Sequence, residues 1–445
     1  MRFGGGDELN RSLRALWTLA IGLAAIVSGC GKQTDSHRIP VAELGSQVTI
    51  NLMHLWPESG APAQYQLVNQ IIDEYQTANP HVTIEQEVLE NERYKAKIKV
   101  LSAVNELPDV GMTWAAGYIR PFARGKLFTP LDELLRGELR DSFVAGSIEA
   151  YTVDGNTYAL PLEFNLAPVY YNKQIFAQYG LQPPATYDEF LRIVNTLASH
   201  GVEPIVLGNK DRWTGSLWYM YLADRIAGTQ TLANAIKGTA SFADPGLVDA
   251  ARRVQDLVER NAFNKGFNGL SNDEVKADFV QGKYAMYLMG TWELPNYTTN
   301  LGIPQALRDN IGFFKFPSVS GGKSDIDSWV GGPGVGLFVA ENSPVKLEAK
   351  KFVKYFVKRW GEESVTGAGV IPATKVDTAK VQLPQLYVDL INEVNQAKRI
   401  TLFADVLLPS GAAEVHLNQI QALFGKEITP EEFASAHDAA IRLGK

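Results

Sequence analysis

The residues of this sequence whose type and placement could form a ligand site are its tryptophans, of which there are eight. An indole ring can lie flat against the C–H face of a pyranose, while nearby Asp, Glu, Asn and Arg side chains hydrogen-bond the hydroxyl groups around it. Ligands of open α/β sheets bind beyond the carboxyl ends of the strands, so rings placed there predict a carbohydrate site. Four tryptophans fall where a predicted strand or its following loop ends, and two lie near such points: Trp56, Trp114, Trp213 and Trp292, then Trp218 and Trp329.

For any one of these rings the alternative is a partly buried anchor in the core, which we expect for Trp360. Sequence motifs of catalysis and metal binding are missing. The six histidines are scattered, without an HExxH motif or a pair at metal-ligand spacing, and there is neither a GxSxG elbow nor a GxxxxGK(S/T) loop. In the glycine-rich run at 331–336, Pro333 and the lack of a following lysine favour close backbone packing over phosphate binding. We therefore expect no catalytic residue, no metal and no cofactor.

Composition excludes several classes of protein. With 445 residues the chain is too long for one ordinary core, so two lobes are expected. Hydrophobic residues make up 45% and charged residues 20%, as in soluble globular proteins. The net charge of -7 argues against nucleic-acid binding, which needs a basic face.

The N-terminus has the pattern of a bacterial lipoprotein signal. Arg2, Arg11 and Arg14 precede an apolar run at 16–30, which is short for a membrane span and ends in Val-Ser-Gly-Cys. Cys30 is the only cysteine, so we expect residues 1–30 to be a signal peptide and Cys30 to carry the lipid after cleavage. A signal peptide with an incidental cysteine is the alternative. The polar residues 31–46 predict a flexible tether.

Strand and helix patterns alternate from residue 48 onward. The apolar runs at 48–56, 82–88 and 108–114 predict strands, and apolar residues at helical spacing in 68–75 and 94–104 predict helices between them. This order indicates a parallel sheet with right-handed crossovers. Further along, strands are expected at 202–207, 284–288, 311–316 and 329–340, with a helix around residues 352–360 and helices over most of the last 75 residues.

Three helix starts are marked by capping residues. Thr186 with Glu189, and Ser271 with Glu274, have the spacing of capping boxes. The Asp-Pro pair at 244–245 predicts an N-cap followed by the first helical residue.

The segment 158–173, YALPLEFNLAPVYYNK, is predicted to connect two lobes. Pro161 interrupts two abutting strand patterns, and Glu163 and Asn165 lie between them. Followed by an amphipathic helix, this segment resembles the extracellular solute-binding proteins of sugar ABC importers, the maltose-binding-like family. The resemblance extends over about residues 47–440 and implies an α/β fold of two lobes, each a central sheet flanked by helices, with crossing hinge strands between them.

The resemblance also implies lobe boundaries and a set of ligand contacts. One lobe would comprise 47–160 with 318–363, the other 161–317 with 364–445, and the strand at 311–316 would return the chain to the first lobe. The segments GMTWAAGYIRPFARGKLFTPLDEL and QGKYAMYLMGTWELPN carry Trp114 and Trp292, the latter as the foremost stacking candidate. The implied ligand-binding set is Trp56, Glu58, Trp114, Glu163, Asn165, Asp211, Trp213, Trp292 and Trp329, whereas the likeness around Asp405 and Glu414 is too loose to choose between them.

The function implied is capture of a carbohydrate, expected to be an oligosaccharide, by hinge closure, and its delivery to an ABC permease without bond breakage. The expected partners are the solute, the permease and the membrane through a lipid anchor, for a monomer at the cell envelope, either periplasmic or on the outer face of the cytoplasmic membrane. One alternative is a binding protein for a polyamine, peptide or polyol phosphate. Another is a secreted glycoside hydrolase, since its two carboxyl groups need only lie ~5–10 Å apart in space.

Overall fold

The computed structural model describes residues 47–377 and 381–443. The predicted signal peptide, Cys30 and the tether up to residue 46 lie outside the described residues. Within the described ranges, no helix combines the length and apolarity needed to cross a bilayer.

The first sheet has five strands in the order β2-β1-β3-β12-β6. β1 (Val48–His54) is parallel to both β2 (Val82–Val88) and β3 (Val110–Trp114), as the alternating strand and helix patterns predict. The other two strands of this sheet come from later parts of the chain. β12 (Val335–Val339) is antiparallel to β3 and to β6 (Leu160–Pro161).

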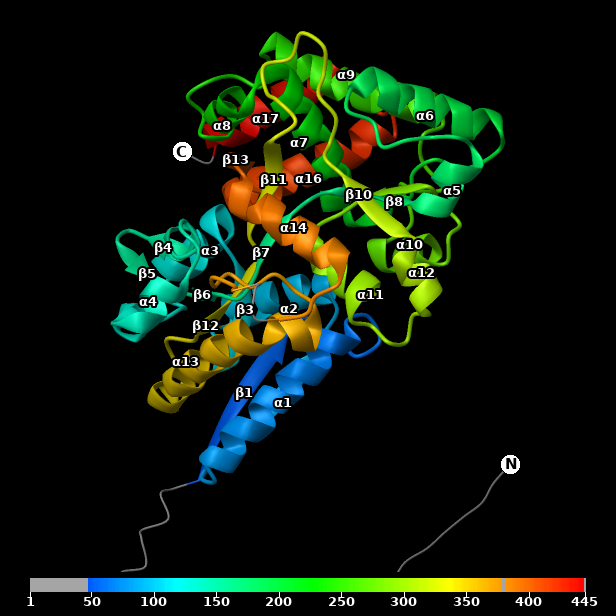
Figure 1. Ribbon diagram of the computed structural model, residues 1–445. Helices are drawn as coiled ribbons and strands as arrows, with labels where there is room; N and C mark the ends of the chain where they lie inside the picture. The colour runs from blue at the N-terminus through cyan, green and yellow to red at the C-terminus, as the bar shows by residue number, and fades with distance from the viewer. Residues whose placement is uncertain (1–46, 378–380, 444–445) are drawn as a thin grey trace, which may run out of the picture. The chain divides into compact units, whose positions relative to one another are not determined.

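Helices pack on this sheet to form what we call the first lobe (Figure 1). α1 (Pro62–Ala78) and α2 (Asn91–Ala103) connect the parallel strands, and α1 ends just before Asn79-Pro80, where the proline disfavours further helix. α13 (Lys346–Glu363) lies beside α1, with Phe352, Phe356 and Trp360 buried as predicted. The remaining elements of this lobe are α3 (Ala116–Arg124), η1 (Asp132–Leu135), α4 (Glu138–Ser142), η2 (Glu149–Tyr151) and the hairpin β4 (Thr152–Val153)–β5 (Asn156–Thr157).

The second lobe is built around a three-stranded sheet in the order β10-β8-β9. β8 (Val169–Asn172) is antiparallel to both β10 (Ile311–Phe314) and β9 (Met286–Leu288). The predicted strand at 202–207 is wrong, because only Ile205 forms isolated bridges there, to Phe263 and Met286. Residue 204 is a proline and lacks the N–H that a continuous ladder requires.

The helices of the second lobe begin where the capping residues predict. Thr186 and Glu189 form a capping box at the start of α6 (Tyr187–Ser199), and Ser271 and Glu274 form one at the start of α10 (Asn272–Val280). Asp244 caps α9, which runs from Pro245 to Glu259. The other elements of this part of the chain are α5 (Lys173–Gln178), η3 (Asn209–Asp211), α7 (Trp213–Ala227), α8 (Thr229–Ile236), η4 (Thr291–Glu293), α11 (Leu294–Thr298), α12 (Gln305–Asp309), α14 (Gln385–Gln396), α15 (Ala404–Leu407), α16 (Ser410–Phe424) and α17 (Pro430–Leu443).

A third, small sheet connects the two lobes. In it β11 (Ser328–Pro333) is antiparallel to β7 (Phe164–Leu166) and parallel to β13 (Arg399–Thr401). The predicted strand at 329–340 is therefore two strands, β11 and β12, which belong to different sheets and are separated only by Gly334. The strand predicted at 311–316 is β10, which pairs with β8, and the next strand that joins the first sheet is β12.

The glycine-rich run between β11 and β12 packs tightly, as predicted. A Cβ atom on Gly331 would lie 2.3 Å from the carbonyl oxygen of Asn165, and one on Gly334 would lie 2.4 Å from the Asn165 amide nitrogen. Larger residues would separate β11 from β7, so close approach of the crossing strands requires glycine at both positions.

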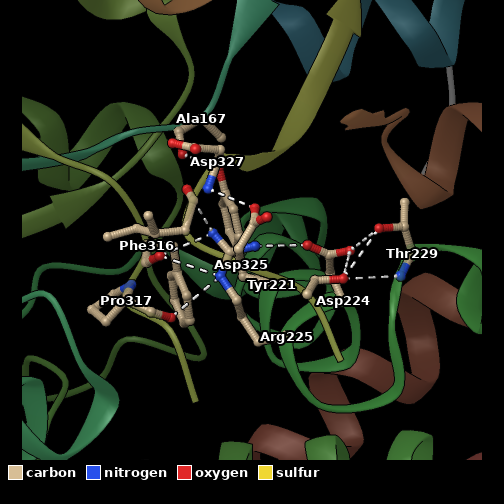
Figure 2. Close-up of polar contacts among 11 residues, drawn as sticks. Ala167, Tyr221, Asp224, Arg225, Thr229, Phe316, Pro317, Asp325 and Asp327 are labelled. Atoms are coloured by element: carbon tan, nitrogen blue, oxygen red, sulfur yellow. Dashed lines mark hydrogen bonds and ion pairs between the residues drawn. The ribbon is translucent and has the colours of Figure 1, made fainter. Parts of the chain in front are cut away.

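Helix α7 holds the chain segment that leads into β11. The Arg225 guanidinium is fully buried, pairs with Asp224 at 2.7 Å, and donates to the Phe316 carbonyl at 2.9 Å and the Pro317 carbonyl at 3.3 Å (Figure 2). The Asp224 carboxylate also accepts a hydrogen bond of 2.7 Å from the Thr229 hydroxyl. Both buried charges thus have hydrogen-bond partners within the protein, as buried charges need.

The same helix holds the other crossing strand. The Tyr221 hydroxyl donates to the Ala167 carbonyl at 2.7 Å, directly after β7, and its ring stacks on Phe316 with centroids 4.6 Å apart (Figure 2). One helix therefore fixes the second-lobe ends of both β7 and β11.

Candidate functional site

A cavity of about 190 Å³ lies where the two lobes face each other. This is more than ten times the ~10–15 Å³ that a single water molecule requires, so the cavity can hold a small organic solute. Its walls come from the ends of β1 and β3, the start of α2 and the crossing segment, and, on the other side, from α7, α10, η4 and α15.

Aromatic rings from both lobes line this cavity. The first lobe contributes Trp56 and Trp114, and the second contributes Trp213, Trp292 and Phe403. Trp292 packs edge-to-face between Trp213 and Phe403, with centroid distances of 5.8 and 5.6 Å. Such packing fixes the ring planes, so that they offer preformed flat surfaces to a ligand.

Lys95, at the edge of the cavity, connects the aromatic groups of the two lobes. Its Nζ lies 5.1 Å from the ring centroid of Trp114 and 6.0 Å from that of Trp213. Both distances are within the range of cation–π attraction. Lys95 also pairs with Glu92 at 3.0 Å, one turn earlier on α2.

Glu163 presents a free acceptor to the cavity. Its side chain is 4% exposed, and Oε2 accepts a long 3.4 Å hydrogen bond from Asn165 Nδ2. Oε1 is buried and has no hydrogen-bond partner among the described residues. Burial raises the pKa of Glu163 to about 7, and the hydrogen bond from Asn165 opposes this shift.

The orientation of Asn165 is set by a residue of η4. The Thr291 hydroxyl donates to Asn165 Oδ1 at 2.9 Å and accepts from the Leu166 N–H at 3.2 Å. The Asn165 amide nitrogen must therefore face Glu163. In this way the crossing strand β7 and the loop that carries Trp292 are joined beside the cavity.

Further charged groups line the second-lobe wall. Asp405, on α15, faces the cavity, and burial raises its pKa. Lys276 pairs with Asp273 at 2.6 Å, and its Nζ lies 3.4 Å from the Gly60 carbonyl of the first lobe. Burial acts to lower the pKa of Lys276, but Glu293 and Asp273 outweigh it, and the pKa is raised.

Of the nine predicted ligand contacts, the structure brings six together at the cavity: Trp56, Trp114, Glu163, Asn165, Trp213 and Trp292. Asp211 lies behind the lining, where its carboxylate accepts from the Asn272 N–H at 2.8 Å and supports the start of α10. Burial raises the pKa of Asp211 to about 6.

Glu58 and Trp329 are not part of the cavity lining. Glu58 lines an open surface depression beside α1 instead. Trp329 is 1% exposed and lies on β11, which is buried along its whole length. Trp218 is likewise a core residue, packed against Phe263 and Phe316.

Sequence reasoning missed several lining residues. Ser216, Leu217 and Met220 follow Trp213 on α7, Pro333 is the last residue of β11, and Phe403 lies in the loop before α15. A helix that starts with a cavity tryptophan presents its residues three, four and seven positions later on the same face, and this spacing could have identified the α7 contacts. Within residues 47–377 and 381–443, no three His, Cys, Asp or Glu side chains are grouped so that they could hold a metal ion.

The chain is similar to several known proteins. Multiple sugar-binding protein of Streptococcus mutans is 24% identical over 356 residues, which are 76% of this chain and 78% of that protein. Melibiose/raffinose/stachyose-binding protein MelE of Bacillus subtilis is 21% identical over 349 residues, which are 77% and 78% of the two chains.

Solved structures share the whole fold. A protein solved in work on xylan utilization by the thermophilic bacterium Caldanaerobius polysaccharolyticus is 35% identical, with a TM-score of 0.83 over 88% of this chain and 99% of that one. A chitin oligosaccharide binding protein is 24% identical, with a TM-score of 0.82 over 90% and 99%. The two-lobed α/β architecture with crossing strands is therefore that of solute-binding proteins.

The family model described as bacterial extracellular solute-binding protein matches residues 60–359, about two thirds of the sequence. Its span begins before α1 and includes the crossing segment, β11, β12 and nearly all of α13. The chain thus belongs to the family of bacterial extracellular solute-binding proteins.

Proposed function

We propose that this protein captures a carbohydrate in the cavity between its lobes and delivers it to the membrane subunits of an ABC importer. The observation that carries the proposal is that indole rings from both lobes meet at one cavity together with polar groups of the crossing strand, Glu163 and Asn165. Flat apolar faces beside hydrogen-bonding groups are what a sugar ring needs. Relatives named for multiple sugars and for melibiose, raffinose and stachyose support a carbohydrate, and the 35% identical protein linked to xylan utilization favours xylo-oligosaccharides.

Hinge closure is the proposed mechanism. The ligand would contact both lobes and stabilise the closed state by its greater affinity for that state. The contacts support a change in the lobe boundaries expected from sequence. Residues 316–327 are held by Arg225 of the second lobe, whereas Ile371 and Ala373 hydrogen-bond to Phe164 and Leu162 beside the first. We therefore propose crossings near residues 161–166, at Gly334 and shortly after Ala373.

Thermal-shift measurements with a saccharide panel test the function. The protein from Gly31 onward is heated with xylo-, chito- and malto-oligosaccharides, raffinose and melibiose, each in large excess. A specific ligand raises the melting temperature because it binds the folded state only. Titration calorimetry on each positive sugar then gives the affinity, and no shift with any sugar would refute the proposal.

A cationic solute is the second candidate, because acidic groups outnumber basic ones in the lining. Glu90, Glu163, Asp273, Glu293 and Asp405 are found there with only two lysines. Aromatic rings beside carboxylates also suit polyamines. Spermidine and putrescine therefore belong in the panel, and stabilisation by them alone would favour this candidate.

We also propose that the chain is anchored through a lipid on Cys30. The sequence before it supports this, and the polar residues 31–46 would separate the folded part from the membrane. Metabolic labelling with a fatty acid, compared between the natural chain and Cys30→Ser, tests the anchor. Equal labelling of both proteins would refute it.

A further inference from the structure

A chain of three hydrogen bonds runs from the wall of the cavity into the core of the second lobe. Ser216 Oγ lies 2.6 Å from His416 Nε2, and His416 Nδ1 lies 2.8 Å from His437 Nε2. His437 Nδ1 then lies 2.7 Å from the Phe433 carbonyl oxygen. The participants belong to α7, α16 and α17, so three helices distant in sequence meet along this chain.

The residues of this hydrogen-bond chain are buried, and only Ser216 lines the cavity. Ser216 is 2% exposed and lines the cavity, while His416 and His437 are each 1% exposed. Phe433 covers one side of the pair, and Phe242 stacks on His437 with centroids 4.6 Å apart. Exchange with bulk water is therefore limited to the end at Ser216.

Burial favours the neutral form of both histidines. Burial lowers the pKa of His437 to about 4 and that of His416 well below its ordinary value, with the neighbouring ring adding to the shift of His416. The charged group next to His437 is Asp438, whose carboxylate accepts from the Phe242 N–H at 2.8 Å and from the Ser241 hydroxyl. Asp438 favours the charged form of His437, but burial outweighs it.

The Phe433 carbonyl at the end of the hydrogen-bond chain determines which atom donates in each of the three bonds. Phe433 O can only accept, so His437 Nδ1 carries the proton and His437 Nε2 must accept. His416 therefore carries its proton on Nδ1 and accepts at Nε2. The only proton left for the first bond is that of the Ser216 hydroxyl, which must point at His416 and away from the cavity.

We infer that Ser216 is a ligand contact that acts only as a hydrogen-bond acceptor, with His416 and His437 as the positioning residues that hold it so. A serine without such a partner rotates and can donate or accept, commonly donating to a carbonyl of its own helix. Here the lone pairs of Ser216 Oγ are left for the cavity. This inference rests on the proposed function and deepens it, because it states what the ligand must offer at this wall.

The ligand must present an O–H or N–H to Ser216. When Glu163 is ionised, its Oε1 atom also requires a hydrogen-bond donor from the ligand. A sugar hydroxyl can satisfy either group, whereas an ether oxygen, a fluorine or an O-methyl group cannot. The site therefore selects a sugar that has a hydrogen-bond donor at a defined position of its ring. The shape of the cavity alone does not enforce this selection.

Nitrogen NMR of the histidine rings tests the direction of the chain without any ligand. In protein labelled with ¹⁵N-histidine at neutral pH, we expect His416 and His437 both as neutral rings protonated at Nδ1. His416→Gln and His437→Gln assign the two sets of signals by their loss. A ring protonated at Nε2, or a cationic ring, at either position would overturn the inference.

Binding of xylotriose and its monodeoxyfluoro analogues tests the contact. Fluorine keeps a weak acceptor but removes the donor, so at one hydroxyl position we expect the analogue to bind the natural protein about two- to tenfold more weakly than xylotriose, the range for one neutral hydrogen bond. Ser216→Ala should bind xylotriose more weakly by a similar factor and should no longer distinguish it from that analogue. Unchanged discrimination in Ser216→Ala at every position would overturn the inference.

Variants of His416 separate positioning from folding. Gln can accept from Ser216 and donate to His437, whereas Leu can do neither, so His416→Gln should keep the discrimination between xylotriose and the fluoro analogue and His416→Leu should lose it. His200→Leu, at an exposed histidine at the end of α6, is the matched control and should change nothing. Melting temperatures in the absence of sugar show whether each variant is folded.

Two other results have distinct meanings. If the natural protein binds no saccharide, the proposed carbohydrate function fails, while the NMR spectra still decide the direction of the hydrogen bonds.

Ser216 beside a histidine also has the arrangement of an activated nucleophile. Release of p-nitrophenol from p-nitrophenyl acetate that disappears in Ser216→Ala would overturn the assignment of Ser216 as a binding contact.

Discussion

The indole rings of Trp56 and Trp360 lie parallel, with centroids 4.6 Å apart and 2° between the ring planes. Trp56 lines the cavity at the end of β1, and Trp360 is buried near the end of α13, where it also stacks on Phe356. A helix that does not reach the cavity therefore fixes the plane of one of its aromatic walls.

Replacing Trp360, which packs behind the cavity residue Trp56, should weaken ligand binding. Trp360→Leu removes the surface on which Trp56 rests, and we expect a loss of about 2–4 kcal/mol in the free energy of unfolding, as for large-to-small changes in a core. Affinity for a bound saccharide should fall because Trp56 gains rotational freedom. Urea unfolding and titration calorimetry measure the two effects, and full affinity in a destabilised variant would show that Trp56 needs no support.

Trp292→Ala should remove the central stacking face. Trp292 lies between Trp213 and Phe403, so its loss exposes a gap on the second-lobe wall. We expect binding to weaken by ~1–3 kcal/mol, the range for burying a large apolar side chain. Leu301→Ala, at an exposed leucine, is the control. Unchanged affinity by titration calorimetry would remove Trp292 from the site.

Stability should fall with rising pH because of Glu163. Its pKa is about 7 in the folded protein against 4.5 ordinarily, so between these values the folded state keeps a proton that the unfolded chain has released. The free energy of unfolding therefore decreases from about pH 4.5 to 7 and then levels off. Glu163→Gln should be more stable than the natural protein at about pH 8, by about 1–3 kcal/mol, but not at about pH 4.

Urea unfolding across this range checks the prediction. An advantage of Glu163→Gln that is equal at both ends of the range would show that the benefit comes from packing rather than from loss of the carboxylate.

The buried pair of Asp224 and Arg225 should show strong coupling. Asp224→Asn leaves the guanidinium buried without its counter-ion, at an expected cost of about 3–5 kcal/mol in unfolding free energy. Because most of this cost is an unpaired charge, Asp224→Asn combined with Arg225→Met should cost less than the sum of the two single changes. Chemical denaturation of the four proteins measures the coupling, and simple additivity would mean that the pair does not act as a unit.

Closure of the lobes should be sensitive to Gly117. This residue of α3 lies against α15 of the other lobe, and a Cβ there would be 2.1 Å from the Leu408 carbonyl oxygen. Gly117→Ala should hold the lobes apart and weaken ligand binding by about 1–3 kcal/mol, the usual cost of overpacking. Gly411→Ala, where a Cβ meets nothing within 4 Å, is the control.

Small-angle X-ray scattering with bound sugar should show a larger radius of gyration for Gly117→Ala than for the natural protein. Identical scattering and affinity would mean that the contact between α3 and α15 yields at little cost.

Local signals in the sequence predicted local structure well. The capping boxes at Thr186 and Ser271 and the Asp244 N-cap each depend on residues within four positions of one another, and all three are confirmed. The parallel strands up to Trp114 were predictable from short apolar or alternating runs, since β3 is buried over most of its length while β2 alternates between buried and exposed residues at its start.

Features that depend on distant partners were not predictable. Trp56 and Trp329 were both predicted to lie at or near the end of a strand or its loop, and only the pairing of β11 with β7 and β13 buries Trp329 away from the cavity. Likewise Ser216 and His416 are 200 residues apart, and neither lies in a motif. The hydrophobic periodicity of a helix does not indicate which other helices it will contact.

The position of β12 in the first sheet has a consequence for how the protein is made. This strand occupies the place between β3 and β6, yet it emerges from the ribosome more than 170 residues after β6. Until residue 339 has been synthesised, β3 has an unpaired edge and the N-terminal part of the chain cannot complete its native core. At ~5–20 residues per second this leaves a delay on the order of ten seconds or more, during which export machinery or chaperones would meet a chain that has not yet folded.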